Sequence, residues 1–168
     1  MQYYIYQGTS QSNLTKVATV TDTKSYTVTG LNANTTYYFA VSAFNGLRES
    51  EKSNVLSVKT SAIPATAITL TISNKTLEVG GTIQAQVSVT PSNHTDGAVT
   101  YVSSATNVAT VSNTGLITAK AKGTTDITAK VGSVTSAIVT ITVYEALVTV
   151  TNLTSSNVSA SGATLSWT

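Results

Sequence analysis

The chain has 168 residues, of which 41% are hydrophobic and only 10% are charged, and its net charge at pH 7 is +2. The few cations form no cluster, so the sequence gives no reason to expect a nucleic-acid partner. No apolar run is long enough to span a membrane. The absence of cysteine excludes disulfides and thiolate metal sites. Abundant β-branched residues, with Asn, Ser and Gly between them, predict an all-β protein.

The first segment, residues 1–60, is predicted to form successive β-strands. Apolar residues alternate with polar ones at residues 3–5, 17–19, 26–28, 37–43 and 55–57. Residues 61–65 are predicted to be a linker, because Pro64 restricts the residue before it to extended geometry.

The second segment, residues 66–146, shows the same strand pattern, punctuated by glycine-containing turns. Its strands are expected at residues 68–72, 83–89, 99–101, 108–111, 116–117, 127–129 and 138–143. The last segment, residues 147–168, is predicted to supply two more strands, at residues 147–153 and 160–168. No segment has a helical period of useful length.

The run GLNANTTYYFAVSAFN, residues 30–45, resembles the turn-and-strand signature of a fibronectin type III domain. The resemblance implies that Tyr37 is the tyrosine corner of that fold and that Leu31 packs against it. At the other end of the chain, Leu165 and Trp167 resemble the second strand and core tryptophan of the same family. Residues 1–60 are thus expected to be that domain from its third strand onward, and residues 147–168 its first two strands.

Between these pieces, the runs VATVSNTGLITA (residues 108–119) and GTTDIT (residues 123–128) resemble a bacterial immunoglobulin-like domain of group 2. The resemblances imply two immunoglobulin-like β-sandwiches. One is complete within residues 66–146, and the other is divided between the N- and C-terminal segments.

The divided domain has three explanations. It closes on itself as a permuted domain, it is completed by the C-terminal hairpin of a neighbouring subunit, or the chain is a window cut from a longer tandem array. Strand donation is expected when the chain is expressed as it stands, because head-to-tail joining needs no reversal of the chain. In that case Leu165 and Trp167 of the donor hairpin should be buried near Leu31 and Tyr37 of the acceptor sheet.

No set of residues in the sequence forms a persuasive catalytic or metal-binding motif. His94 lies in a turn with Ser92 and Asp96, a spacing that rarely produces a nucleophile–base–orienter line, and it is expected to be a solvated loop residue. Glu49 and Glu51 are flanked by cations and are expected to lie in a solvated loop. The sequence therefore predicts no catalytic residue, no metal site and no cofactor, and a protein that is not an enzyme.

Aromatic side chains suggest a contact surface. If Tyr37 points into the sandwich, alternation along the strands places Tyr4, Tyr6 and Tyr38 together on the outer face. Cross-strand tyrosine pairs can simply stabilise a sheet, but tyrosine is also enriched at interfaces. Partner binding is expected at these tyrosines or at the loop of residues 46–53, which contains Arg48 and Glu49.

The two resemblances imply a structural or adhesive module on an extracellular surface. Both families occur in tailed-phage virions, on bacterial cell surfaces and in secreted glycan-degrading enzymes. The chain starts at Met without a secretion signal, which favours a tail or capsid-decorating virion protein. Its partners would be other copies of itself or other virion or surface proteins, with cell-surface glycan as a further candidate. The alternative is a segment of a bacterial adhesin or a glycan-binding accessory module.

Overall fold

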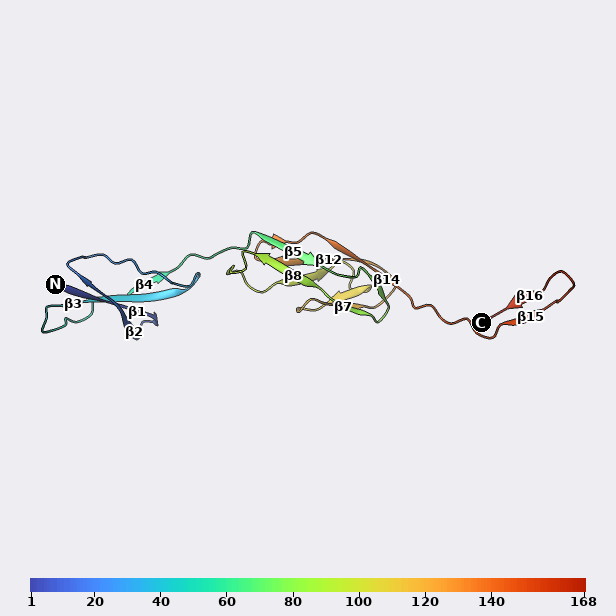
Figure 1. The fold of residues 1–168 in the computed structure, drawn as a ribbon, viewed down its shortest axis with the longest axis horizontal. Helices are drawn as coiled ribbons and strands as arrows, with labels where there is room; N and C mark the ends of the chain where they lie inside the picture. Colours follow the sequence, from blue (N-terminus) through green and yellow to red (C-terminus); the bar gives the residue numbers. More distant parts are fainter. The chain divides into compact units, whose positions relative to one another are not determined.

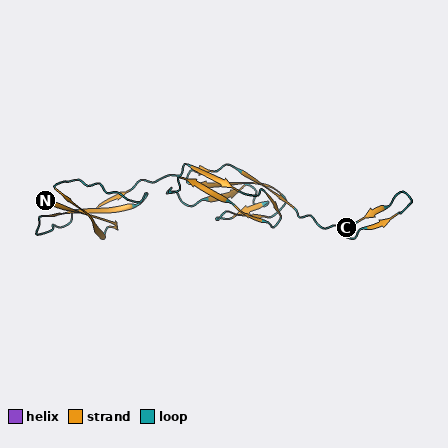
Figure 2. Cartoon of the chain, viewed as in Figure 1, coloured by secondary structure: helices purple, strands orange, loops and turns teal.

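The computed structural model describes residues 1–168, which consist of strands, turns and loops without a helix (Figure 2). The structure accordingly offers no helix that could span a membrane. This secondary structure confirms the all-β class expected from the composition.

The N-terminal segment forms one antiparallel sheet of four strands in the order β2-β1-β3-β4 (Figure 1). Tyr3 pairs with Ala43, and Ile5 with Val41, across the central pair of strands. Because side chains alternate along a strand, Tyr3, Ile5 and Val41 share one face of the sheet. The strands are β1 (Gln2–Ser10), β2 (Asn13–Thr21), β3 (Thr36–Phe44) and β4 (Leu56–Lys59).

The strand expected at residues 26–28 is not formed, and that expectation was wrong. Tyr26 and Val28 retain the alternation that predicted it, and both line the inner face of the sheet. Their backbone, however, has no neighbouring strand with which to pair. Alternation predicts which side chains are buried, but a strand also requires a partner for its N–H and C=O groups.

A tyrosine corner fixes the turn that leads into β3. The Tyr37 hydroxyl accepts a hydrogen bond from the backbone N–H of Asn32 at 3.0 Å, and the Tyr37 side chain is only 6% exposed. The Thr60 hydroxyl donates to the Asn32 carbonyl at 2.6 Å and ties the same turn to the end of β4. Tyr37 therefore has the geometry that the fibronectin resemblance implied.

The middle segment contains ten strands, in sheets ordered β10-β11-β7, β13-β12-β14-β6 and β5-β8, with β9 also paired to β12. Its fully buried apolar side chains include Ile117, Ile127 and Ile141. Alternating buried and exposed positions along β5, β12 and β14 are typical of a β-sandwich. The strands are β5 (Ala67–Thr71), β6 (Thr76–Glu78), β7 (Thr82–Gln84), β8 (Gln86–Thr90), β9 (Thr100–Ser103), β10 (Ala109–Val111), β11 (Leu116–Ala119), β12 (Gly123–Val131), β13 (Val134–Thr135) and β14 (Val139–Tyr144).

The chain enters and leaves this sandwich beside opposite ends of β12. At the entrance, Ala65 donates its N–H to Asp96, and Asp96 lies against Gly132, which follows β12 directly. At the exit, β14 ends at Tyr144, one residue beyond the pairing of Val143 with Gly123 at the start of β12. This nine-residue strand is about 26 Å long.

The C-terminal segment is a short hairpin of β15 (Thr154–Ser156) and β16 (Thr164–Ser166). Reciprocal backbone hydrogen bonds between Thr151 and Thr168, at 2.7 and 3.0 Å, extend the ladder beyond these bounds. The expected strand at residues 147–153 is absent, and the second strand is shorter than predicted. Thr151 and Thr168 form the last pair of the hairpin. Residues 147–150 lie beyond that pair and have no strand opposite them.

Candidate functional site

The loop that contains His94 does not form a catalytic arrangement. His94 Nδ1 lies 4.0 Å from Asp96 Oδ2, which is too far for a hydrogen bond, and Ser92 makes no hydrogen bond to either residue. The Asp96 carboxylate instead accepts the N–H of Ala65 at 2.5 Å. The His94 side chain is 17% exposed and its Nδ1 is buried without a hydrogen-bond partner. The expectation of a solvated histidine was therefore wrong.

Acidic and histidine side chains do not converge elsewhere in the chain. No group of three or more such residues is placed where it could hold a metal ion.

The outer face of the N-terminal sheet carries a cluster of aromatic and charged side chains. The Tyr4 ring stacks on Phe44 with centroids 5.4 Å apart, and Lys16 Nζ lies 3.9 Å from the centre of the Tyr4 ring. Lys52 Nζ lies 4.4 Å from the centre of the Tyr6 ring. Each cation thus covers the face of an aromatic ring. The predicted tyrosines Tyr4 and Tyr6 are on this face, but both are half-buried.

Glu49 is the centre of the cluster. Its Oε1 atom accepts hydrogen bonds from the Tyr6 hydroxyl and from the Ser42 hydroxyl, the latter at 2.5 Å. The hydrogen bond from Ser42, with that from Tyr6, lowers the pKa of the Glu49 carboxyl below its usual range. The same contact with Glu49 raises the pKa of Tyr6. The carboxylate is used to fasten the loop of residues 46–53 to the sheet.

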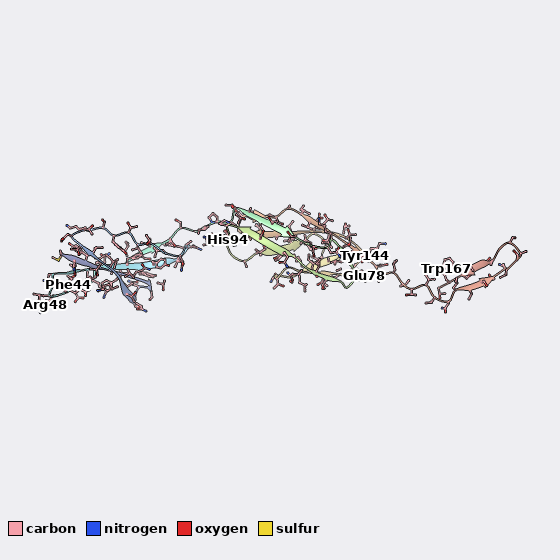
Figure 3. The ribbon with its side chains drawn as sticks, viewed as in Figure 1. Phe44, Arg48, Glu78, His94, Tyr144 and Trp167 are labelled. Carbon is pink, nitrogen blue, oxygen red and sulfur yellow. The ribbon has the colours of Figure 1, made fainter.

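Loop residues next to Glu49 are held by the side chain of Asn45. The N–H groups of Leu47 and Arg48 donate to Asn45 Oδ1 at 3.0 and 2.9 Å. Phe44 and Glu49 form an isolated β-bridge. Arg48 itself is exposed, at the tip of the loop (Figure 3). It remains a candidate contact residue, whereas Glu49 is engaged within the molecule.

Tyr38 stands apart from Tyr4 and Tyr6. It lies on β3 opposite Gly8 and makes no ring-stacking or cation–π contact. The cluster instead includes Ser42, Phe44, Lys16 and Lys52, which the sequence analysis did not single out. Alternation from Tyr38 along β3 would have indicated Ser42 and Phe44. Lys16 lies on β2, where a register shift in the β1–β2 pairing sets its position, and its Nζ covers the Tyr4 ring. Lys52 lies in the loop of residues 46–53, and its Nζ covers the Tyr6 ring.

The inner face of the same sheet is an open apolar groove of about 590 Å³. Val41 and Leu56, on its floor, are exposed although both are large aliphatic side chains. Val28 and Leu31 lie along the wall formed by the loop before β3. Its other lining residues are Tyr3, Ile5, Val20, Thr23, Lys24, Ser25, Tyr26 and Phe39. An apolar sheet face normally packs against a second layer, and this one has only the single segment of residues 23–31.

The remaining predicted core residues lie on the C-terminal hairpin. The side chains of Leu165 and Trp167 are 55% and 60% exposed, and Trp167 is seen on the hairpin in Figure 3. In this structure of one chain, Trp167 is therefore not buried by its own hairpin. Leu31 and Tyr37, its expected neighbours, belong to the groove wall and to the strand beneath it.

Comparisons with known families match the first two segments of the chain. Residues 1–59 match the fibronectin type III domain, and residues 64–143 match the bacterial Ig-like domain (group 2). Domains of these two families are typically non-catalytic structural modules. A comparison with curated protein sequences gives no significant match.

Several solved structures resemble the chain. Domains 1–6 of the surface layer protein SbsC are 19% identical, with a TM-score of 0.38 over 92% of this chain and 21% of that chain. Murine CEACAM1b is 12% identical, with a TM-score of 0.38 over 85% of each chain. The FN1–FN3 domains of chicken CNTN1 are 14% identical, with a TM-score of 0.34 over 99% of this chain and 65% of that one. The chain spans about a fifth of the SbsC chain, and these similarities do not indicate what it binds.

Proposed function

Because the chain joins a fibronectin type III segment to a bacterial Ig-like domain of group 2, we propose that it is a non-catalytic structural module on an extracellular surface. Within that class, we assign it to a phage virion, as a tail or capsid-decorating protein whose copies are joined head to tail. The observation that supports a structural role is that acidic side chains form hydrogen bonds within the molecule. Glu49 and Asp96 both hold backbone or loop segments in place through hydrogen bonds within the chain.

The chemistry of the chain suits assembly inside a cell. Without cysteine, its stability does not depend on an oxidising compartment. Its low charge and exposed β-sheet faces provide surfaces for neighbouring proteins. A virion protein of this kind would fold in the cytoplasm and be released by lysis.

The alternative is a segment of a bacterial adhesin or a glycan-binding accessory module of a secreted enzyme. It is favoured by Tyr4 and Tyr6, whose rings lie on an outer sheet face where a sugar or protein could be contacted. Their coverage by Lys16 and Lys52 leaves less ring surface free than such a role would use. For this reason the virion proposal is preferred.

Two measurements separate these proposals. An antibody raised against the chain should label intact virions, and the gene should lie beside genes for tail or capsid proteins. Labelling of the wall of uninfected bacteria, with a signal peptide and a wall anchor encoded upstream, would instead establish the adhesin. Release of soluble sugar from peptidoglycan or polysaccharide by the purified chain would contradict both.

A further inference from the structure

The inner face of the N-terminal sheet is apolar, but no second layer of strands covers it. Val41 is 37% exposed on the floor of the groove, and Leu56 and Tyr26 are more exposed still. All three line the same cavity of about 590 Å³. Contiguous apolar surface of this kind is unfavourable in water, so an occupant that covers it would be stabilised by burial.

The wall of the groove also presents an unused strand edge. Tyr26 and Val28, two residues apart in this wall, both line the cavity. The backbone of residues 26–28 makes no hydrogen bond within the chain. A segment of this kind can accept an added strand through its free N–H and C=O groups. The occupant should therefore be a β-strand with an apolar face.

The C-terminal hairpin has both properties. Ser155 pairs with Leu165, so Leu153, Leu165 and Trp167 lie on one face by strand alternation. These three side chains are 66%, 55% and 60% exposed. Only one edge of β16 is used, by its partner β15, and the other edge is free. The hairpin thus carries an apolar face and an open edge that match those of the groove.

The length of the connecting chain argues that the hairpin comes from a second copy. Seven residue steps from Tyr144 to Thr151 extend at most about 25 Å. That length is used up in returning along β12, which itself spans about 26 Å. The linker of residues 61–65 is also held in place. The N–H groups of Ile63, at 3.0 Å, and of Ala65 are hydrogen bonded to Thr95 and Asp96, and a change in the path of the linker would break these bonds.

We propose that the groove of residues 20–56 binds the β15–β16 hairpin of a second copy of this chain. In the complex, β16 pairs with residues 25–29, and Leu165 and Trp167 pack against Leu31, Tyr37 and Phe39. This inference rests on the proposed structural role, and it names the two surfaces through which neighbouring copies would be joined. The groove and the hairpin are different surfaces, so each copy can accept one neighbour and donate to another. Such heterologous contacts build open chains unless their rotation closes a ring.

A mixing experiment tests the joint with two complementary variants. Val41→Lys places a charge on the groove floor and leaves the hairpin intact, whereas Trp167→Ala leaves the groove intact and removes the main donor side chain. Each variant alone should be monomeric by sedimentation, and an equimolar mixture should form a one-to-one heterodimer. Trp167→Ala should weaken self-association of the wild-type chain by at least about a hundredfold.

Controls distinguish a lost joint from lost folding. Val158→Ala changes an exposed residue in the hairpin loop and should assemble as the wild type does. Circular dichroism should show both blocked variants folded, and Leu56→Lys serves as a second groove variant if Val41→Lys unfolds. A mixture that stays monomeric would overturn the proposal, as would a wild-type chain that is a compact monomer with Trp167 shielded. Either result would exclude head-to-tail joining but leave the virion location standing, since antibody labelling of virions tests that location separately.

Discussion

Replacing Tyr37 by Phe tests how the N-terminal sheet is held together. Tyr37 is nearly buried, and its hydroxyl accepts the N–H of Asn32 at 3.0 Å. Phe fills almost the same volume, so packing in the strand is kept and only the hydrogen bond is lost. The turn that carries Leu31 to the edge of the groove would then be less firmly attached to β3.

The expected cost is about 1 kcal/mol, the net value of an ordinary intramolecular hydrogen bond. A larger penalty would apply if the Asn32 N–H were left buried without a partner. Asn32 is exposed, however, and water can replace the hydroxyl. A loss of about 1 kcal/mol corresponds to a fivefold increase in opening of the sheet.

Amide hydrogen exchange along β3, followed by NMR at a fixed protein concentration, measures this opening directly. Tyr38→Phe is the matched control, because the neighbouring Tyr38 hydroxyl makes no hydrogen bond within the chain. We expect that control to change the free energy of opening by no more than about 0.5 kcal/mol. Equal effects of the two substitutions, or a larger effect at Tyr38, would refute the assignment of Tyr37 as the structural anchor.

Three further predictions concern other contacts of the chain. Because hydrogen bonds lower the pKa of Glu49, its contribution to stability should be present above the usual pKa of Glu and be lost as pH falls through the lowered value. Ser42→Ala should move the pKa of Glu49 upward in an NMR titration, and an unchanged titration would exclude Ser42 as a cause. Thr125→Val should cost about 1–3 kcal/mol in urea unfolding, since the Thr125 hydroxyl, on a side chain only 2% exposed, accepts a backbone N–H at 2.9 Å. Gly132→Ala should destabilise the middle domain, because φ is +53° there and a Cβ would lie 2.6 Å from Asp96 Oδ1; an unchanged melting temperature would show that the loop can relax.

Local patterns predicted most of the strands that have partners, but they missed the short strands β6 and β13. Alternation and turn residues located β1, β3, β5 and β14, and the Tyr37 corner followed from the signature around it. The same alternation at residues 26–28 was misleading, because strand formation depends on a neighbour that no local pattern reports. His94 was misassigned for a related reason. Its burial results from contacts of the surrounding loop with distant segments, including Ile63 and Ala65.

The outer-face cluster shows the same limit. Alternation placed Tyr4 and Tyr6 on one face, but the hydrogen bond from Tyr6 to Glu49 joins residues 43 positions apart. A register shift between Ile5 and Tyr6 brings Lys16 opposite Tyr6, and such a shift leaves no clear mark in the sequence. The types of residue in the cluster were therefore predictable in part, while their contacts depended on tertiary structure.

The fluorescence of Trp167 tests the donated hairpin most directly, because it is the only tryptophan in the chain. Its emission and its quenching by iodide should be measured over a wide dilution range, together with the molar mass from light scattering. If one copy completes the groove of the next, emission at high concentration should be blue-shifted and protected, and both features should disappear on dilution as the mass falls to that of a monomer. Emission that stays the same at every concentration, with an unchanging mass, would contradict the account.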